Sequence, residues 1–512
     1  MDPRRLGGAV RLLGLHRGRH RPDRPHRTRP RLRGTDGGPA HHLPRTGAQR
    51  GPAPLALRPR GQLAVVGPAM GGGPLSYAQQ GMWFLERRAG TTLYADPMTF
   101  RLVGDLDHTA LHRSIEELVR RHEALRTRFP VVAGTPVRQV TDDVRVPLGQ
   151  ADLTGLPVWE RDAAADRCLA EDLRRPFDLA RGPVVRAALI RLGAREHLLR
   201  ITAHHLVSDA RSWWAVLFRE LEQLYTAFLH GRPSPLPSAP AQYGDFVRWQ
   251  HDWLDGPAYA RQLAHWERAL AEVTPLPDLS LATADPPAGR ATTARPATAW
   301  LTFPQPLHQR LRAVAREARV TLYMVLLTAF GQVLRRHTDT DDLLVGTRGG
   351  FRGRPEFEQA VGFFVNVLPI RLRVARDADF GALLGQVRHT LLGVYVNRDI
   401  PYERLMAELG LKRPGFRPVI NVCVSFQSTP EVPPALEGLH ATLVNHDPYS
   451  GYALDLGFYE EDGALRALLT HDRGRYDDEA ARRLLDELVD TLRTVADPAE
   501  SPDRPHRPRS AV

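Results

Sequence analysis

Cysteine and lysine are both scarce in this chain of 512 residues. It contains two cysteines, Cys168 and Cys423, and a single lysine, Lys412, although Lys and Arg together number 69. Two isolated cysteines provide neither a disulfide framework nor the paired spacing of a zinc site. We therefore expect a reduced, cytoplasmic protein that binds no metal.

Long apolar runs are also missing. No stretch approaches the roughly 20 apolar residues that cross a bilayer. Arg11 and Arg17 interrupt the one apolar stretch near the N-terminus, which is contrary to the pattern of a signal peptide. These features exclude a membrane-spanning protein and disfavour a secreted one.

Positive charge is confined to one end of the chain. The net charge is +11, but residues 1–70 alone carry +12 and the remainder carries −1. Residues 1–72 are rich in Arg, Pro and Gly and have no hydrophobic period, so we expect a disordered segment. Either it is a basic tail, or it is a mis-assigned start that translates upstream DNA. The nearly neutral remainder indicates no nucleic-acid partner.

Beyond Leu75 the hydrophobic pattern predicts two similar sets of strands and helices, which is the α+β class. A Pro-, Ala- and Thr-rich linker, 273–296, separates an N-terminal lobe, 73–272, from a C-terminal lobe, 297–497, and a loose tail follows at 498–512. Helices are expected after Asp107 and Asp209 and over 76–88, 156–175, 243–254, 305–318, 321–336, 379–396, 401–409 and 476–496. Strands are expected over 97–103, 184–191, 196–205, 297–303, 342–346, 361–374, 418–427, 439–445, 452–459 and 464–471.

The most informative stretch is 204–210, His-His-Leu-Val-Ser-Asp-Ala. It joins a predicted strand, which ends at His205, to a predicted helix that Ser208 or Asp209 would cap. His205 leaves the apolar face of the strand and points toward the free N–H groups of that helix. This arrangement would place a proton acceptor beside donors for a developing oxyanion. A buried structural histidine and a simple helix cap remain the alternative.

Seven segments, read in order, are similar to the motifs of the condensation domain of nonribosomal peptide synthetases. They span roughly residues 75–497 and are SYAQQGMWFL, RHEALRTRF, HHLVSDA, YGDFVRW, VGFFVNVLPIR, NRDIPYERL and, more weakly, RPVINVCVSFQ. The third resembles the active-site pattern H-H-x-x-x-D-G. The family resemblance implies two chloramphenicol-acetyltransferase-like lobes that meet in a V, with a tunnel between them.

The resemblance also implies a reaction and its partners. Two carrier proteins would present thioesters on phosphopantetheine arms, and an acceptor amine would attack the donor thioester to form an amide. The protein itself would bind no cofactor. Carrier, adenylation and thioesterase motifs are missing from the sequence, so we expect a monomeric condensation enzyme, either free-standing or one piece of a module, that acts on carriers supplied in trans.

Residue roles follow from motif position. His205 matches the second histidine and would orient the acceptor amine or accept its proton. His204 matches the first and is expected to be structural. Asp209 would pair with an arginine across the site, either Arg352 or, as a second candidate, Arg371.

Asn366 matches the F-V-N motif and is either a tunnel-lining group or a satisfied amide at a strand end. Its Phe-Val-Asn context favours condensation over the sister epimerisation domains, which share the histidine motif. Val367 replaces a threonine of the family pattern, and two further positions depart from it. Ala210 replaces a glycine, which either strains the backbone or narrows the tunnel, and Gly81 replaces an arginine of the first motif.

Three functions therefore remain open. The first is amide formation between two carrier-bound substrates. The second is acyl transfer from a carrier to a free small amine or alcohol. The third is a degenerate domain that only recruits carriers.

Overall fold

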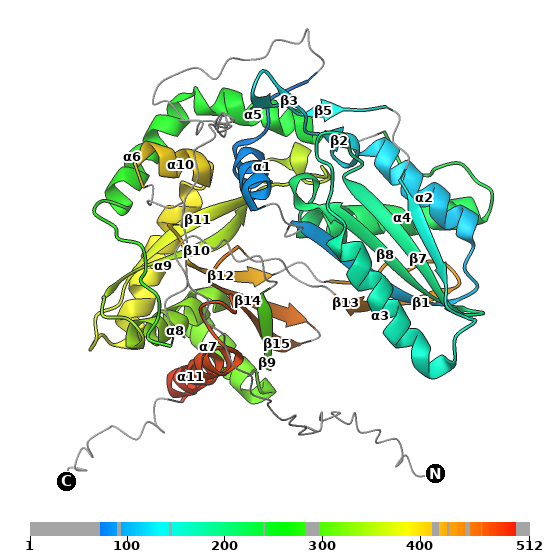
Figure 1. Ribbon diagram of the computed structural model, residues 1–512. Helices are drawn as coiled ribbons and strands as arrows, with labels where there is room; N and C mark the ends of the chain where they lie inside the picture. Colours follow the sequence, from blue (N-terminus) through cyan, green and yellow to red (C-terminus); the bar gives the residue numbers. More distant parts are fainter. Residues whose placement is uncertain are drawn as a thin grey trace, which may run out of the picture. The chain divides into compact units, whose positions relative to one another are not determined.

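The computed structural model describes residues 72–89, 94–142, 146–238, 241–281, 296–411, 419–427, 431–445, 451–461 and 463–497. Within these ranges it confirms the α+β class, with two open sheets and helices packed on them (Figure 1). Apart from Gly72, the predicted disordered segment and the predicted tail 498–512 lie outside the described residues.

The first lobe is built on a five-stranded sheet with the order β13-β1-β8-β7-β6. Most of its elements match the predicted ranges within two residues, whereas β6 has no counterpart among the predicted strands. The elements of this lobe are α1 (Tyr77–Ala89), β1 (Ala95–Gly104), α2 (His108–Arg121), β6 (Leu148–Asp152), α3 (Val158–Arg174), β7 (Val185–Gly193), β8 (Glu196–His204), α4 (Phe218–Leu229) and α5 (Tyr243–Leu254).

The second lobe has a six-stranded sheet with the order β11-β10-β12-β14-β15-β9. No helix among the described residues is both long enough and apolar enough to cross a bilayer. The elements of this lobe are α6 (Pro257–Ala269), β9 (Ala297–Thr302), α7 (Gln305–Glu317), α8 (Leu322–Arg336), β10 (Asp342–Gly350), β11 (Val365–Arg373), α9 (Phe380–Val396), α10 (Tyr402–Glu408), β12 (Val422–Gln427), β14 (Leu454–Glu461), β15 (Ala464–His471) and α11 (Asp478–Ala496).

The apolar core of the second lobe begins earlier in the chain than the predicted linker, 273–296. Trp266 on α6, together with Leu270 and Val273, is buried in the apolar core of the second lobe. Helix α6 was not predicted, because its apolar residues are few and the burial of Trp266 depends on a lobe formed by later sequence. The lobe boundary therefore falls between α5 and α6 in terms of packing, and only 273–281 and 296 of the predicted linker are described.

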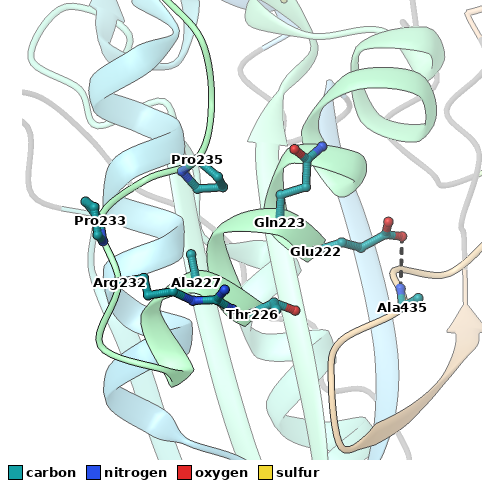
Figure 2. A pocket seen from close by; sticks show the side chains of 8 residues that line it. All are labelled: Glu222, Gln223, Thr226, Ala227, Arg232, Pro233, Pro235 and Ala435. Atoms are coloured by element: carbon teal, nitrogen blue, oxygen red, sulfur yellow. Dashed lines mark hydrogen bonds between the residues drawn. The ribbon is translucent and has the colours of Figure 1, made fainter.

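One strand crosses from the second half of the sequence into the first sheet. Strand β13 (Leu439–Asn445), predicted among the strands of the second lobe, pairs antiparallel with β1. The segment before it is anchored on α4, where the N–H of Ala435 donates to the Glu222 carboxylate at 2.9 Å. Figure 2 shows this contact beside a hollow of about 410 Å³. The pairing of β13 with β1 therefore joins the two lobes through a strand that is far from the histidine motif in the sequence.

Candidate active site

His205 is held at the start of a 3₁₀ turn, His205–Val207, directly after β8 ends at His204. Its backbone N–H donates to the carbonyl of Tyr94 at 2.8 Å. Its ring Nδ1 lies 2.7 Å from the carbonyl oxygen of Ser208. Because a carbonyl can only accept, Nδ1 carries the proton and Nε2 presents a lone pair. Among the described residues none is hydrogen-bonded to Nε2.

The imidazole is partly buried and packs against a ring from the second half of the chain. The centroids of His205 and Phe363 are 5.1 Å apart. The hydroxyl of Tyr243, on α5, donates to the carbonyl of Phe363 at 2.7 Å and lies 2.9 Å from the Ser76 hydroxyl. Burial raises the pKa of Tyr243, so this hydroxyl remains a donor. Tyr243 thus fixes the residue that supports the imidazole.

Gly362 makes this arrangement possible. A Cβ added at Gly362 would lie 2.0 Å from Cδ2 of Tyr243, well inside any allowed contact. The backbone of the second lobe can therefore approach the tyrosine ring only with glycine at this position.

His204 points to the other side, as its alternate position on the strand predicts. Its ring is 1% exposed and lies edge-on to Phe177. Burial lowers the pKa of His204, although the carboxylate of Glu86 acts in the opposite direction. Nδ1 accepts the N–H of Leu206 at 3.1 Å, so a neutral His204 stabilises the turn that carries His205.

Asp209 and Arg352 form a buried ion pair between the two lobes. The Arg352 guanidinium donates through Nη1 to Oδ2 at 2.6 Å and through Nη2 to Oδ1 at 2.9 Å. The side chains of Asp209 and Arg352 are 3% and 8% exposed, respectively. Arg352 also donates to the hydroxyl of Ser212 and the carbonyl of Ala360, and its guanidinium lies over the ring of Phe364.

Each oxygen of Asp209 has a further donor. Oδ1 accepts the N–H and the hydroxyl of Ser212, both at 2.8 Å, and Oδ2 accepts the N–H of Phe364 at 3.1 Å. Burial alone would raise the pKa of this carboxyl. Arg352 and Ser212 outweigh burial and lower the pKa below its ordinary value. Asp209 is therefore an ionised, fully bonded group and not a free base.

Asp209 also caps the helix that follows, as one of the two predicted caps. The cap uses the N–H of Ser212, so this donor is occupied and cannot hold an oxyanion. The helix opens with a π-helical segment, Ser212–Leu217, before α4. Ala210 starts the helical segment and is not among the described non-glycine residues with a positive φ, which are Ala133, Glu272 and Arg319. Of the two consequences considered for Ala210, backbone strain therefore does not arise in this chain.

The structure contradicts the predicted pairing of Arg371 and selects one of the two alternatives for Asn366. Arg371, the second candidate partner for Asp209, instead binds Asp342 on the neighbouring strand, with Nε 2.8 Å from Oδ1. Asn366 is 3% exposed and fully bonded: Nδ2 donates to the carbonyls of Arg398 and Ile400, and Oδ1 accepts the N–H of Tyr402. It is thus the satisfied amide of the two alternatives, and it shapes the turn before α10.

Three residues around the site had no predicted role. Ser212 was not singled out, and Tyr243 and Phe363 appeared only as part of motif segments. The contact of Phe363 with His205 could not be predicted, because it joins segments about 160 residues apart. Among the described residues, no group of three or more His, Cys, Asp or Glu side chains is placed to hold a metal ion.

Comparison with known proteins agrees with the motifs. A family model described as Condensation domain matches residues 71–506. One of the linear gramicidin synthase proteins of Brevibacillus parabrevis is 34% identical over 427 residues, covering 82% of this chain and 6% of that protein. Phosphinothricin tripeptide synthetase PhsB of Streptomyces viridochromogenes is 34% identical over 473 residues, covering 91% of this chain and 39% of that protein. The chain therefore spans well under half the length of these relatives.

Solved structures confirm the fold. The X-domain from teicoplanin biosynthesis matches with a TM-score of 0.74 and 25% identity, covering 84% of this chain and 96% of that domain. The first condensation domain of the calcium-dependent antibiotic synthetase, solved with a substrate analogue, matches with a TM-score of 0.67 and 22% identity. This second match covers 83% of the chain and 97% of that domain.

Removing one partner of the buried ion pair should destabilise the fold. We expect Arg352→Met to lower the free energy of unfolding by about 3–5 kcal/mol at pH 7, because it leaves the Asp209 carboxylate buried and unpaired. Denaturant unfolding followed by tryptophan fluorescence measures this loss. The double variant Arg352→Met/Asp209→Leu removes both charges and should recover much of it. A single variant as stable as wild type would contradict the inferred importance of the pair.

The Tyr243 hydroxyl should contribute separately. Tyr243→Phe keeps the ring but leaves the Phe363 carbonyl and the Ser76 hydroxyl without this partner. We expect a loss of about 1–3 kcal/mol in the free energy of unfolding, typical of a buried polar group that loses its bond. Tyr225→Phe, which removes a buried hydroxyl bonded to the N–H of Asp107, is the matched control for the site-specific effects described below.

Proposed function

The chain belongs to the condensation-domain family, and we propose that it forms an amide bond between a donor acyl thioester and an acceptor amine, each carried on a phosphopantetheine arm. The acceptor nitrogen bonds to the thioester carbonyl carbon, and the carbon–sulfur bond then breaks. The amine proton passes to Nε2 of His205 and from there to the departing thiolate. Atoms and charge balance without any other reactant.

The single observation that carries this proposal is the 2.7 Å contact between Nδ1 of His205 and the carbonyl oxygen of Ser208. The Ser208 carbonyl keeps the proton on Nδ1, so the lone pair of Nε2 is available on a partly accessible ring. A free α-amine has a pKa of about 8, so an appreciable fraction is already neutral near pH 7. Holding that amine in line with the carbonyl would therefore matter at least as much as the strength of the base.

In this proposal, three side chains hold neighbouring segments in place and transfer no proton. They are Asp209, Arg352 and Asn366. Asp209 has every oxygen bonded and a lowered pKa, so it fixes the segment that follows His205. Arg352 fixes Asp209. Ala210 lies next to this pair, and its methyl group would narrow the channel near the reacting carbonyl.

The proposed partners are donor and acceptor carrier proteins supplied in trans, acting with a monomeric enzyme in the cytoplasm. The arms would enter a tunnel between the lobes and meet at His205. The enzyme would need no cofactor of its own, because the phosphopantetheine belongs to the carriers. The likeness to single segments of gramicidin and phosphinothricin tripeptide synthetases supports a carrier-bound pair of substrates.

A second candidate function is the recruitment of another protein without catalysis. One observation favours it: the chain is 25% identical to an X-domain of teicoplanin biosynthesis whose complex with the protein OxyB has been solved. In that case His205 would serve only the local fold. The two functions make opposite predictions for substitution of this histidine.

His205→Ala should remove turnover while leaving the fold intact. We expect product formation from a loaded carrier pair to fall by about 10²–10⁴-fold, the usual contribution of a positioned acid–base group. The assay offers donor and acceptor carriers bearing a panel of acyl and aminoacyl thioesters and detects the amide by mass spectrometry. Tyr243→Phe should reduce turnover more modestly, whereas Tyr225→Phe should not.

The same assay separates the alternatives. Free amines and alcohols, offered beside loaded acceptor carriers, test acyl transfer to a small acceptor. Binding of carriers without product from any pair would support the recruiting function. Undiminished turnover by folded His205→Ala would refute the assigned role of the imidazole.

A further inference from the structure

Helix α1 of the first lobe rests on α10 of the second lobe at Gly81 and Glu403. A Cβ added at Gly81 would lie 2.8 Å from both Cγ and Oε1 of Glu403. The carboxyl group of Glu403 is therefore packed against the bare backbone of α1. This contact lies where the first motif of the family carries an arginine.

No ion-pair partner is found for the carboxyl group of Glu403 among the described residues. Its Oε2 is shielded from solvent and has no hydrogen-bond partner among the described residues. The nearest cation in sequence, Arg404, is directed elsewhere: Nε lies 3.3 Å from the Tyr259 hydroxyl, and Nη2 lies 2.5 Å from the Glu408 carboxylate. An ionised Glu403 would thus hold charge on a solvent-shielded oxygen with no counter-ion among the described residues.

Among the described side chains, the neighbouring elements offer Glu403 no cation. On α1, Arg87 lies over the ring of Trp83, and Glu86 lies on the side of His204. Burial raises the pKa of Tyr77, one turn before Gly81, so this hydroxyl is neutral and supplies no cation. From β11 the contact to α10 is made by Asn366, which is neutral.

The two helices that meet here are tied to opposite sides of the active site. On α1, Gln79 donates through Nε2 to the carbonyl of Leu206, the residue after His205, at 2.9 Å. On α10, the N–H of Tyr402 is bound by Asn366, three residues beyond Phe363. A shift of α1 against α10 would therefore move the segment that bears His205 relative to the ring that supports it.

We propose that Glu403 is a positioning residue that makes this contact between the lobes dependent on its protonation. The neutral carboxylic acid packs against Gly81, whereas the carboxylate favours solvent and loosens α1 from α10. The effect on stability stands by itself, and the effect on turnover rests on the proposed function.

The sign of the pH dependence follows from burial. Burial raises the pKa of Glu403 from 4.5 to about 7. The folded state thus keeps a proton that the unfolded chain releases above pH 4.5. The contribution of Glu403 to stability should therefore fall as the pH rises from 4.5 toward 7 and level off above it. Within the folded state, ionisation itself is centred near pH 7.

Glu403→Gln tests the effect on stability. The amide resembles the neutral acid and cannot ionise, so its thermal midpoint should match wild type near pH 5 and exceed it by about 2–5 °C at pH 8. Glu317→Gln, at an exposed site on α7, is the matched control and should show no such difference. An equal shift at both pH values would overturn the proposal.

Gly81→Arg tests the missing partner. Its guanidinium would pair with the Glu403 carboxylate, so the thermal midpoint at pH 8 should exceed that of Gly81→Gln, which has comparable helix propensity and no charge. In the background of Glu403→Gln this advantage should vanish. The proposal fails if the thermal midpoint of Gly81→Arg at pH 8 does not exceed that of Gly81→Gln, because a cation at position 81 would then not stabilise the Glu403 carboxylate.

Turnover between pH 6 and 8 supplies the readout for positioning. Relative to wild type, Glu403→Gln should gain activity as the pH rises through 7, with the gain mainly in kcat. Glu403→Gln could show the expected gain in thermal midpoint at pH 8 while its turnover follows the same pH dependence as wild type. That result would limit Glu403 to a structural role and refute its positioning role. Absence of any turnover in wild type would instead count against the proposed function, while the thermal experiments would still decide the contact.

Discussion

The buried pair of Asp209 and Arg352 is the interaction on which the rest of the site depends. Two charges removed from water are tolerable only when their hydrogen-bonding capacity is met. Here Ser212 and the N–H of Phe364 complete the shell of the carboxylate, and Ala360 contributes to that of the guanidinium. Because these donors and acceptors come from segments far apart in the chain, 209–212 and 352–364, the pair forms only when the two segments are packed together.

That constraint also defines the surroundings of His205. The ion pair holds the segment 360–364 of the second lobe against the start of the helix after β8, and this places Phe363 on the imidazole. Tyr243 adds an independent hold on the same segment from α5. The imidazole itself needs little more than the Ser208 carbonyl to have the correct tautomer. The site thus separates a small reactive group from a larger frame that positions it.

Many of the helices and strands could be predicted from the sequence, because they depend on local patterns of residues. Helix caps at Asp107 and Asp209, the strand before His205 and the amphipathic pattern of α11 depend on residues close together in the chain. The pairing of Arg352 was predictable only through the family resemblance. Strand β13 and the position of Phe363 were not, since a strand's sheet and a ring's neighbour depend on contacts between distant segments. The role of Asn366 stayed open for the same reason: its three partners follow it by about 30 residues.

Two of the departures from the family pattern have different physical weight. Ala210 adds a methyl group at a position with ordinary backbone angles, so its consequence is confined to the space beside the ion pair. Gly81 leaves bare backbone where the family pattern has a charged side chain, and the Glu403 carboxyl packs against this backbone with one oxygen unpaired among the described residues. The loss of a cation at position 81 therefore affects more distant residues than the added methyl group at position 210 does. It converts a fixed contact between the lobes into one that responds to protons, and it does so without altering any residue next to His205.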